Sequence, residues 1–209
     1  MLKFALVAVA ALVAVPTLAE PFDGPFIGVQ GGWQQDRTRL TTVDNGVGGR
    51  VSDRTSAFTY GAQLGYDKKI TPQIVLGGEV SLTDQTGSSD VTDALRNAYR
   101  LDTGRTVNAT ARIGYLVRPD TLVYARGGYS NARFDLRDTI GSSTQNRDGY
   151  TVGAGIEKAI TTSVSARLEY DHSDYRNKGF RDVAYDVGAD SVRGQYRRNA
   201  VLAGLNYHF

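Results

Sequence analysis

Arginine recurs in this sequence directly after alanine and before a small or apolar residue, as at Arg112, Arg126 and Arg167. The order Ala, Arg and Tyr appears in Ala111-Arg112-Ile113-Gly114-Tyr115, Ala125-Arg126-Gly127-Gly128-Tyr129 and Ala166-Arg167-Leu168-Glu169-Tyr170. In a β-strand, the Ala and Tyr of each copy share one face and the Arg points to the other. Charges of both signs gathered in one interior predict a network of hydrogen-bonded ion pairs, because an unpaired buried charge is costly. The residues of this predicted network are Glu79, Arg112, Arg126, Glu157, Arg167, Glu169 and Asp171.

Hydrolytic chemistry is the alternative, and its best candidate is the run Tyr170-Asp171-His172-Ser173-Asp174. A histidine, a serine and carboxylates could in principle cleave an ester. Adjacent residues of a regular strand point to opposite faces, however, so His172 and Ser173 form a dyad only at a bulge. A polar strand end is therefore the favoured interpretation, and no catalytic residue is predicted. Walker, dinucleotide and zinc spacings are missing, so neither a cofactor nor a metal is predicted.

The elements that would position these residues are strands. Beyond the amino terminus, about eight segments alternate apolar and polar residues with a period of two, separated by alternately long polar and short turn-like connections. In the segment 57–67, Phe58, Tyr60, Leu64 and Tyr66 face one way, and glycine and polar residues face the other. The alternating segments lie at about 26–33, 57–67, 74–82, 107–115, 123–130, 149–157, 164–171 and 200–209. The long polar connections lie at about 35–55, 83–97, 135–148 and 173–194.

The amino terminus predicts a secretory signal peptide. Lys3 gives a positive start, Phe4 to Val15 an apolar core, and Thr17-Leu18-Ala19 a small-residue cleavage site. A retained membrane helix is the competing interpretation, but the apolar run is shorter than the ~20 residues that a span needs. We therefore predict that residues 1–19 are cleaved and that 20–209 form the mature domain.

Composition agrees with an exported β-protein. The 209 residues include 24 Gly, 12 Tyr and no Cys, which fits short strands without disulfide bonds. The formal net charge is +2, and removal of the signal peptide takes away one Lys. A charge so close to neutral argues against nucleic-acid binding, which needs a dominant basic surface.

The direction in which the apolar faces of the strands point distinguishes a soluble barrel from a membrane barrel. A soluble lipocalin-like barrel buries its apolar face, whereas a membrane barrel turns that face to lipid. The closing strand Ala200 to Phe209 sets Val201, Ala203, Leu205, Tyr207 and Phe209 on one face, with Leu202 an exception on the other. The signal peptide, the alternation of long and short connections, the Tyr-rich strand ends and the terminal Phe together favour lipid outside.

The predicted fold is therefore all-β: an eight-stranded antiparallel up-and-down transmembrane β-barrel with four extracellular loops. Eight strands leave an interior that side chains can largely fill, so the charged network would plug the lumen. Glu79 and Arg112 are the expected pair, since they lie on strands adjacent in sequence. Trp33, near the outer end of the first strand, is predicted to be an interfacial anchor.

These residues resemble the small outer-membrane β-barrel proteins of Gram-negative bacteria, similar to the OmpA transmembrane domain, the opacity proteins and the porin family proteins. The resemblance rests on the signal peptide, the opening Gly24-Pro25-Phe26-Ile27-Gly28, the repeated Ala-Arg-x-x-Tyr pattern and the closing Gly204-Leu205-Asn206-Tyr207-His208-Phe209. It implies an integral outer-membrane location, contact with outer-membrane lipids and lipopolysaccharide, and delivery by periplasmic chaperones. It also implies that a barrel-insertion machine reads the last strand, with Phe209 and Tyr207 as the insertion signal. Unlike full-length OmpA, the sequence is expected to carry no peptidoglycan-binding domain.

Three functions follow as expectations. The first is a structural and surface-interaction role in the cell envelope, in which the loops meet lipopolysaccharide, host or environment. The second is a narrow porin for small solutes, and the lumen charges count against it. The third is an enzyme similar to the outer-membrane lipid A deacylases, which also place His and Ser on a barrel wall. We favour the first function and expect no enzymatic activity.

Overall fold

The computed structural model describes residues 20–44, 47–86, 89–92, 98–138, 141–175 and 191–209, with side chains over 20–37, 54–86, 105–133, 147–175 and 196–209. The predicted signal peptide, 1–19, lies outside the described residues. No helix that is long and apolar enough to cross a membrane is present in the described part of the chain.

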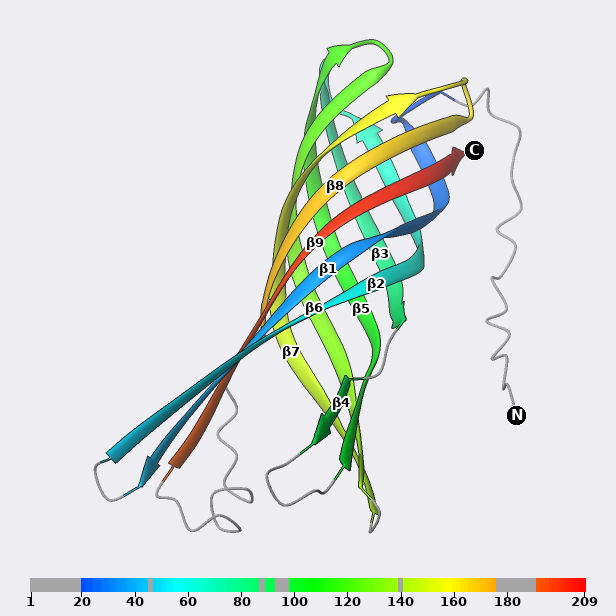
Figure 1. The fold of residues 1–209 in the computed structure, drawn as a ribbon. Coiled ribbons are helices and arrows are strands. Elements are labelled where there is room, and N and C mark those ends of the chain that lie inside the picture. Colours follow the sequence, from blue (N-terminus) through cyan, green and yellow to red (C-terminus); the bar gives the residue numbers. More distant parts are fainter. Residues whose placement is uncertain (1–19, 45–46, 87–88, 93–97, 139–140, 176–190) are drawn as a thin grey trace, which may run out of the picture.

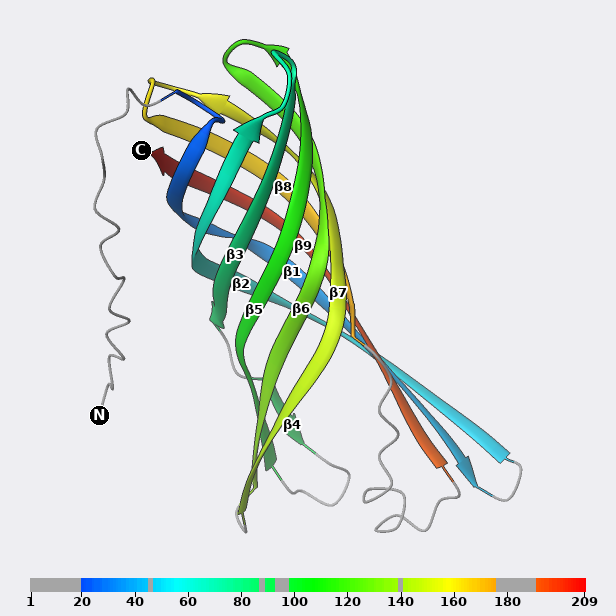
Figure 2. The same ribbon diagram turned by 180° about the vertical axis from the view of Figure 1, so that it is seen from behind.

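Antiparallel strands close into a barrel (Figures 1 and 2). The sheet order is β3-β2-β1-β9-β8-β7-β6-β5-β4, and a further pairing of β3 with β5 closes a ring of eight strands. β4 pairs only with β5 and lies outside this ring. The first and last strands, β1 and β9, form the seam, so the predicted eight-stranded antiparallel barrel is confirmed. The strands are β1 (Gly24–Asp44), β2 (Val47–Lys69), β3 (Ile74–Thr86), β4 (Ser89–Thr92), β5 (Ala98–Arg118), β6 (Thr121–Asp138), β7 (Gly141–Ala159), β8 (Val164–Tyr175) and β9 (Ser191–His208).

Several strands extend far beyond the segments that alternate in the sequence. β1 and β2 remain paired out to Asp44 and Val47, and β6 and β7 out to Asp138 and Gly141. Much of the predicted long loops is therefore paired strand, which projects from one end of the barrel (Figure 1). Outside a membrane both faces of an antiparallel strand pair can contact water. A hairpin can therefore continue there without the alternation of apolar and polar residues that identifies a strand in the sequence. We call this the hairpin end, and the opposite end, where β1 begins and β9 finishes, the terminal end.

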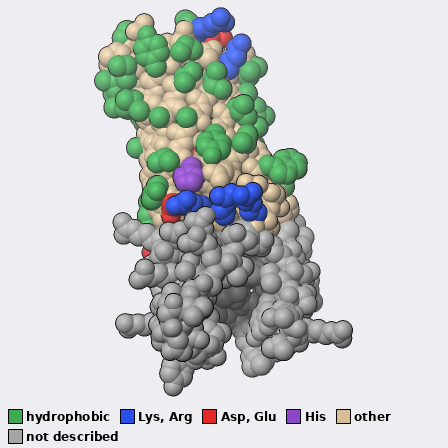
Figure 3. All heavy atoms as spheres, turned by 60° about the vertical axis from the view of Figure 1, so that its left-hand side comes forward, with side chains coloured by type: hydrophobic (Ala, Val, Ile, Leu, Met, Phe, Trp, Pro, Cys, Tyr) green, Lys and Arg blue, Asp and Glu red, His purple; other side chains and the backbone are tan. Residues whose placement is uncertain are grey.

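The outer wall of the barrel is apolar and its interior is polar. Most large apolar residues on the outward positions are exposed, Trp33 at 66% and Leu64 at 56% among them. Apolar side chains cover the barrel wall up to the region beside the hairpins (Figure 3). The inward positions of the same strands hold buried glutamine, threonine, serine and charged residues. This sidedness is that of a barrel in lipid and the reverse of a soluble one.

An apolar cluster fills the interior at the terminal end. Leu116 and Leu122 flank the short turn between β5 and β6, and they pack with Phe22, Val75 and Tyr124. All five side chains are buried. The interior between this cluster and the hairpins contains the charged residues.

Candidate functional site

The first ionic layer of the lumen is built around Arg112 of β5. Arg112 lies opposite Gly77 of β3, and Gly77 lies opposite Asp67 of β2. A Cβ at position 77 would sit 2.1 Å from Asp67 Oδ1, so glycine leaves the gap through which Arg112 reaches Asp67. Arg112 Nε donates to Asp67 Oδ1 at 2.8 Å, and its Nη2 donates to Asp67 Oδ2. Arg112 Nη1 also donates to Glu157 Oε2 at 2.9 Å, so one guanidinium pairs with carboxylates from two other strands.

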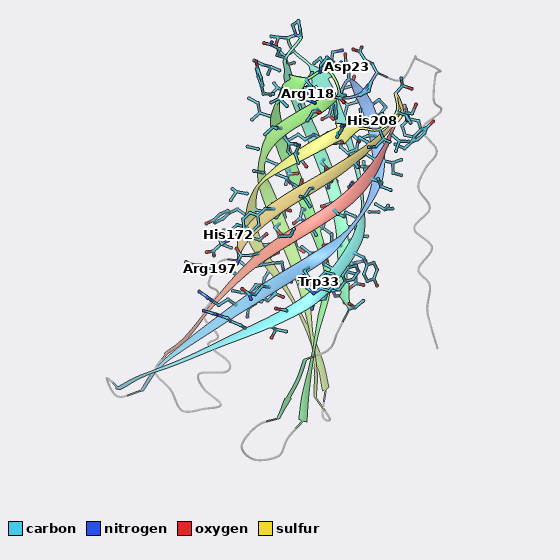
Figure 4. All side chains as sticks on the ribbon, turned by 45° about the horizontal axis from the view of Figure 1, so that its top comes forward. Asp23, Trp33, Arg118, His172, Arg197 and His208 are labelled. Carbon is cyan, nitrogen blue, oxygen red and sulfur yellow. The ribbon has the colours of Figure 1, made fainter. Side chains whose placement is uncertain are left out.

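Glu157 is held from the other side of the lumen by β8 and β9. Its Oε1 accepts hydrogen bonds from Ser165 Oγ at 2.5 Å and Asn206 Nδ2 at 2.7 Å. His208 Nε2 lies 2.9 Å from Ser165 Oγ, and its ring packs at a centroid distance of 5.8 Å from that of Phe22. The first layer therefore joins the charged network to the apolar cluster of the terminal end. His208 lies in the lumen near the terminal end (Figure 4).

The second ionic layer lies nearer the hairpins and contains two arginines and three carboxylates. Arg126 Nη1 donates to Glu169 Oε1 at 2.5 Å and to Glu79 Oε1 at 3.2 Å. Arg167 Nη1 donates to Glu79 Oε2 at 2.5 Å. The Nε of Arg126 is 3.9 Å from Asp171 Oδ1, a separation that gives Coulombic attraction without a hydrogen bond. Arg167 Nη2 is likewise 3.9 Å from Glu169 Oε1, so each arginine of this layer attracts more than one carboxylate.

Inward glycines let three arginines of the lumen reach across two strands rather than one. In these rows the arginine crosses over a glycine on the neighbouring strand toward a polar side chain on the strand beyond. The further rows of this kind are Arg126–Gly153–Asp171 on β6, β7 and β8 and Arg167–Gly204–Gln30 on β8, β9 and β1. In the second row, Arg167 Nη2 donates to Gln30 Oε1 at 2.6 Å. The glycines of the inner face thus leave the space that the long charged side chains occupy.

A third ionic layer lies near the hairpin end. Arg198 Nε donates to Asp36 Oδ1 at 2.8 Å, and its Nη1 donates to Thr106 Oγ1 at 3.0 Å. A cavity of about 30 Å³ adjoins this layer and is lined by Arg198, Thr106 and Asp171 among others. That volume holds one or two water molecules, which suits a space lined by polar groups. The cavity is therefore a water-sized space among polar side chains of the described lumen.

All seven residues of the predicted network lie inside the barrel, and each is 7% exposed or less. The expected pairing of Glu79 with Arg112 is not the one found. Glu79 lies opposite Thr110 in the ladder and pairs with Arg126 and Arg167, whereas Arg112 is two residues nearer the terminal end. Adjacent strands were expected correctly, but their register was not readable from the sequence.

Among the described side chains, three buried charged residues of the lumen were missed. Asp67 belongs to the first layer, and Asp36 and Arg198 form the third. Asp36 fell in a segment predicted as a loop, and Arg198 fell just before the predicted last strand. The inward parity of each strand, continued past its last apolar residue, would have found both. Asp67 already stood on the predicted inner face, but its two-strand reach to Arg112 did not follow from the pattern.

Comparison with known proteins identifies the family of this chain. The model of the outer membrane protein beta-barrel domain family matches residues 5–209. The chain belongs to this family. The protein is therefore an integral outer-membrane β-barrel, as the resemblance in the sequence predicted.

Relatives of this outer-membrane barrel span most of its length. It is 31% identical over 160 residues to a 22 kDa outer membrane protein of Rhizobium leguminosarum bv. viciae, covering 76% of this chain and 70% of that protein. It is 29% identical over 216 residues to a 31 kDa outer-membrane immunogenic protein of Brucella melitensis, covering 94% of this chain and 87% of that protein. The crystal structure of Neisserial surface protein A shares the fold at a TM-score of 0.50 and 16% identity, covering 90% of this chain and all of that one.

The His172 and Ser173 pair does not form a dyad in this outer-membrane barrel. β8 pairs with β7 and β9 in unbroken register, so the two side chains point to opposite faces. Ser173 Oγ donates to Thr151 Oγ1 at 3.1 Å inside the barrel. His172 Nδ1 lies 2.8 Å from Asn199 Oδ1 on the outside (Figure 4). The bulge that an esterase arrangement would need is not present at this position.

The predicted anchor and insertion residues lie on the outer wall. Trp33 is outward, and its ring meets that of Phe58 edge-on at a centroid distance of 5.1 Å. Tyr207 and Phe209 make the same kind of contact at 5.1 Å, at the terminal end. The backbone N–H of Phe209 donates to the carbonyl of Pro25 at 3.1 Å, which seals the end of the seam. Their roles as interfacial anchor and insertion signal stay predictions.

Proposed function

We propose that this protein is a closed barrel with a structural and surface-interaction role in the outer membrane. The observation that carries this proposal is the filled lumen. The side chains of Arg112, Arg126, Arg167, Glu79 and Glu169 are each 3% exposed or less and are joined by ion pairs. Opening a path for solutes would break several buried pairs, and leaving one partner of such a pair alone costs about 3–5 kcal/mol. A narrow porin is therefore the less favoured function.

The paired hairpins are the part of this closed barrel that would be accessible at the cell surface. They project from the end opposite the one where β1 begins and β9 finishes (Figure 1), and we propose that they lie outside the cell and meet lipopolysaccharide, host or environment. A surface position suits the name of the Brucella relative, an outer-membrane immunogenic protein. We further propose that periplasmic chaperones and the barrel-insertion machinery assemble the protein through its last strand.

Planar-bilayer recording tests the closed lumen. The mature protein, folded and inserted into the bilayer, should give no stable conductance steps, because three layers of side chains block the path. Steps of one reproducible amplitude that scale with salt would refute the closed barrel and favour the porin.

Cysteine labelling tests the orientation, since the natural chain has no Cys. Gly49→Cys places a thiol on the β1–β2 hairpin, and Thr71→Cys places one in the short turn at the other end. In intact cells, a membrane-impermeant maleimide should label the first variant and should label the second only after lysis. The reverse pattern would place the hairpins in the periplasm and overturn the surface role.

A further inference from the structure

The second ionic layer of the lumen holds one carboxylate more than it holds arginines. Its cations are Arg126 and Arg167, and its carboxylates are Glu79, Glu169 and Asp171. The five side chains are at most 9% exposed. With every group ionised, two positive charges therefore stand against three negative ones. An uncompensated buried charge is costly, so this layer requires a further positive charge.

The other two ionic layers do not share this imbalance. In the first layer, Arg112 pairs with two carboxylates, but His208 Nε2 lies 3.5 Å from Glu157 Oε1, and an imidazole can take up a proton there. In the third layer, one arginine, Arg198, pairs with one described carboxylate, Asp36. No histidine or lysine pairs with the carboxylates of the second layer among the described side chains. The unbalanced charge is therefore particular to the second layer.

Asp171 is the carboxylate of the second layer with the weakest contacts to donors. Glu79 and Glu169 each accept hydrogen bonds from an arginine, and Glu169 also accepts one from Tyr124 Oη at 2.7 Å. Asp171 Oδ1 is buried and accepts no hydrogen bond from the described side chains. Its separation from Arg126 Nε is 3.9 Å, which is too long for a hydrogen bond. The excess negative charge of the layer therefore lies at Asp171.

The cavity of about 30 Å³ lies where this charge is least compensated, because Asp171 lines it. Asn108 of β5 lines the same cavity, and its Oδ1 is also buried without a hydrogen bond from the described side chains. Hydroxyl groups add further oxygens to the lining, from Thr59, Thr83, Thr106 and Ser173. A water-sized space is thus surrounded by side-chain oxygens, two of which accept no hydrogen bond from the chain.

Arg198 also lines the cavity, but its donors are directed to other groups. Its Nε donates to Asp36 Oδ1 at 2.8 Å, its Nη1 to Thr106 Oγ1 at 3.0 Å and its Nη2 to Tyr196 Oη at 2.9 Å. The rings of Tyr196 and Tyr175 pack at a centroid distance of 5.4 Å, and both side chains are buried. Buried rings beside the cavity lower the local dielectric, which strengthens the attraction between charges there.

We propose that this cavity binds one sodium ion, with Asp171 as its charged ligand and Asn108 Oδ1 as a neutral one. Hard cations prefer oxygen ligands of these kinds. The ion would balance the charge of the second layer and satisfy both acceptor oxygens. A water molecule could donate to the same oxygens but would leave the charge in place.

The charge and the size of the site select a small monovalent ion. Asp171 is the one carboxylate among the side chains that line the cavity, whereas calcium takes six to eight oxygen ligands and is usually held by several carboxylates. A space for one or two water molecules also excludes large organic cations. The proposal goes beyond the surface role of the protein and depends only on the inner wall of the barrel, so either can be refuted without the other.

Urea unfolding in vesicles of zwitterionic phosphatidylcholine tests the site. The mature protein is unfolded in sodium chloride, and in choline chloride at the same total concentration, while the emission of the single tryptophan, Trp33, is followed. The cavity exists only in the folded barrel, so sodium should shift the midpoint to higher urea. Once sodium exceeds its dissociation constant, the ratio of folded to unfolded protein should rise about tenfold for each tenfold rise in sodium.

Two variants of the lining and one matched control locate the effect. Asp171→Asn removes the charge and should abolish the difference between sodium and choline. Asn108→Ala keeps the charge but loses one ligand, so it should raise the dissociation constant of sodium about tenfold, and it serves as the test if Asp171→Asn does not fold. Asp84→Asn removes an exposed carboxylate from β3 in the hairpin half of the barrel and should keep the full difference.

Three results would overturn the proposal. Equal midpoints in sodium and choline would mean that the cavity holds water and that a proton neutralises the second layer. A sodium effect as large in Asp171→Asn and Asn108→Ala as in the natural protein would place the binding of sodium elsewhere. A larger shift in calcium chloride than in sodium chloride at equal ionic strength, lost in Asp171→Asn, would identify a divalent site instead.

Discussion

Replacing Arg112 by methionine should remove about 3–5 kcal/mol from the free energy of unfolding, because it strands buried carboxylates. Methionine keeps the length and the apolar stem of the side chain but donates no hydrogen bond. The Arg112 side chain is 3% exposed, and those of Asp67 and Glu157 are 0% exposed, so water cannot replace the lost donors. The two carboxylates are not stranded equally. Among the described contacts, Asp67 accepts hydrogen bonds from Arg112 alone, whereas Glu157 keeps Ser165 and Asn206.

This difference between Asp67 and Glu157 predicts which second substitution restores more of the stability lost in Arg112→Met. Adding Asp67→Asn to Arg112→Met removes the worse of the two unpaired charges and should recover most of the lost stability. Adding Glu157→Gln instead should recover less, because the side chains around Glu157 are arranged to hold a carboxylate. Urea unfolding in lipid vesicles, followed by the emission of Trp33, gives the free energies. Arg105→Met removes an exposed arginine from the same strand and should change stability by no more than about 0.5 kcal/mol.

Two results would refute this reasoning. If Arg112→Met unfolds within about 1 kcal/mol of the natural protein, water reaches the layer or the carboxylates take up protons without cost, contrary to the burial on which the prediction rests. If the two rescues are equal, the hydrogen bonds that distinguish Asp67 from Glu157 do not set the energy of the layer.

Further predictions concern the glycine gaps and the outer wall. Gly77→Ala should destabilise the barrel by about 1–3 kcal/mol by forcing Asp67 and Arg112 apart, while neighbouring Gly78→Ala, whose Cβ would meet its nearest atom at 4.0 Å, should be neutral in the same urea assay. Phe209→Ala should lower the fraction of heat-modifiable, membrane-inserted protein in cells and raise the fraction that remains uninserted in the periplasm; unchanged insertion would remove Phe209 from the insertion signal. Trp33 should be quenched more strongly by lipids brominated near the headgroup than by lipids brominated at the chain end, and the opposite order would contradict its role as an anchor.

Most of the barrel could be predicted because lipid imposes one rule on every strand. Alternation in segments such as 57–67 and 149–157 identified the outward and inward faces, and those faces hold throughout the described barrel. The hairpin extensions could not be predicted in this way. Beyond the membrane neither face of a strand must be apolar, so paired residues such as Thr42 and Gly49 carry no periodic signal.

The ion pairs were predictable as a group but not as partners. Parity along each strand placed the charges in the lumen, because it depends only on counting residues within one strand. Partnership depends on the register between strands, and β3 and β5 are joined by a connection too long to set it. The register puts Gly77 rather than Glu79 opposite Arg112, and the arginine then reaches over the glycine to a third strand. A rule that considers only adjacent strands cannot predict a contact between Arg112 and a residue two strands away.

Arginine contributes differently to the stability of the barrel on the inner and outer faces of its wall. Inside, Arg112 is surrounded by carboxylates that would be stranded without it, so its charge is explained by the stability of the barrel. Outside, Arg37 lies opposite Arg54 and Arg197 in the neighbouring ladders, and the Arg197 side chain is 47% exposed, so water screens these charges. Removing an arginine should therefore cost more stability inside the lumen, where its carboxylate partners stay buried, than on the outer wall.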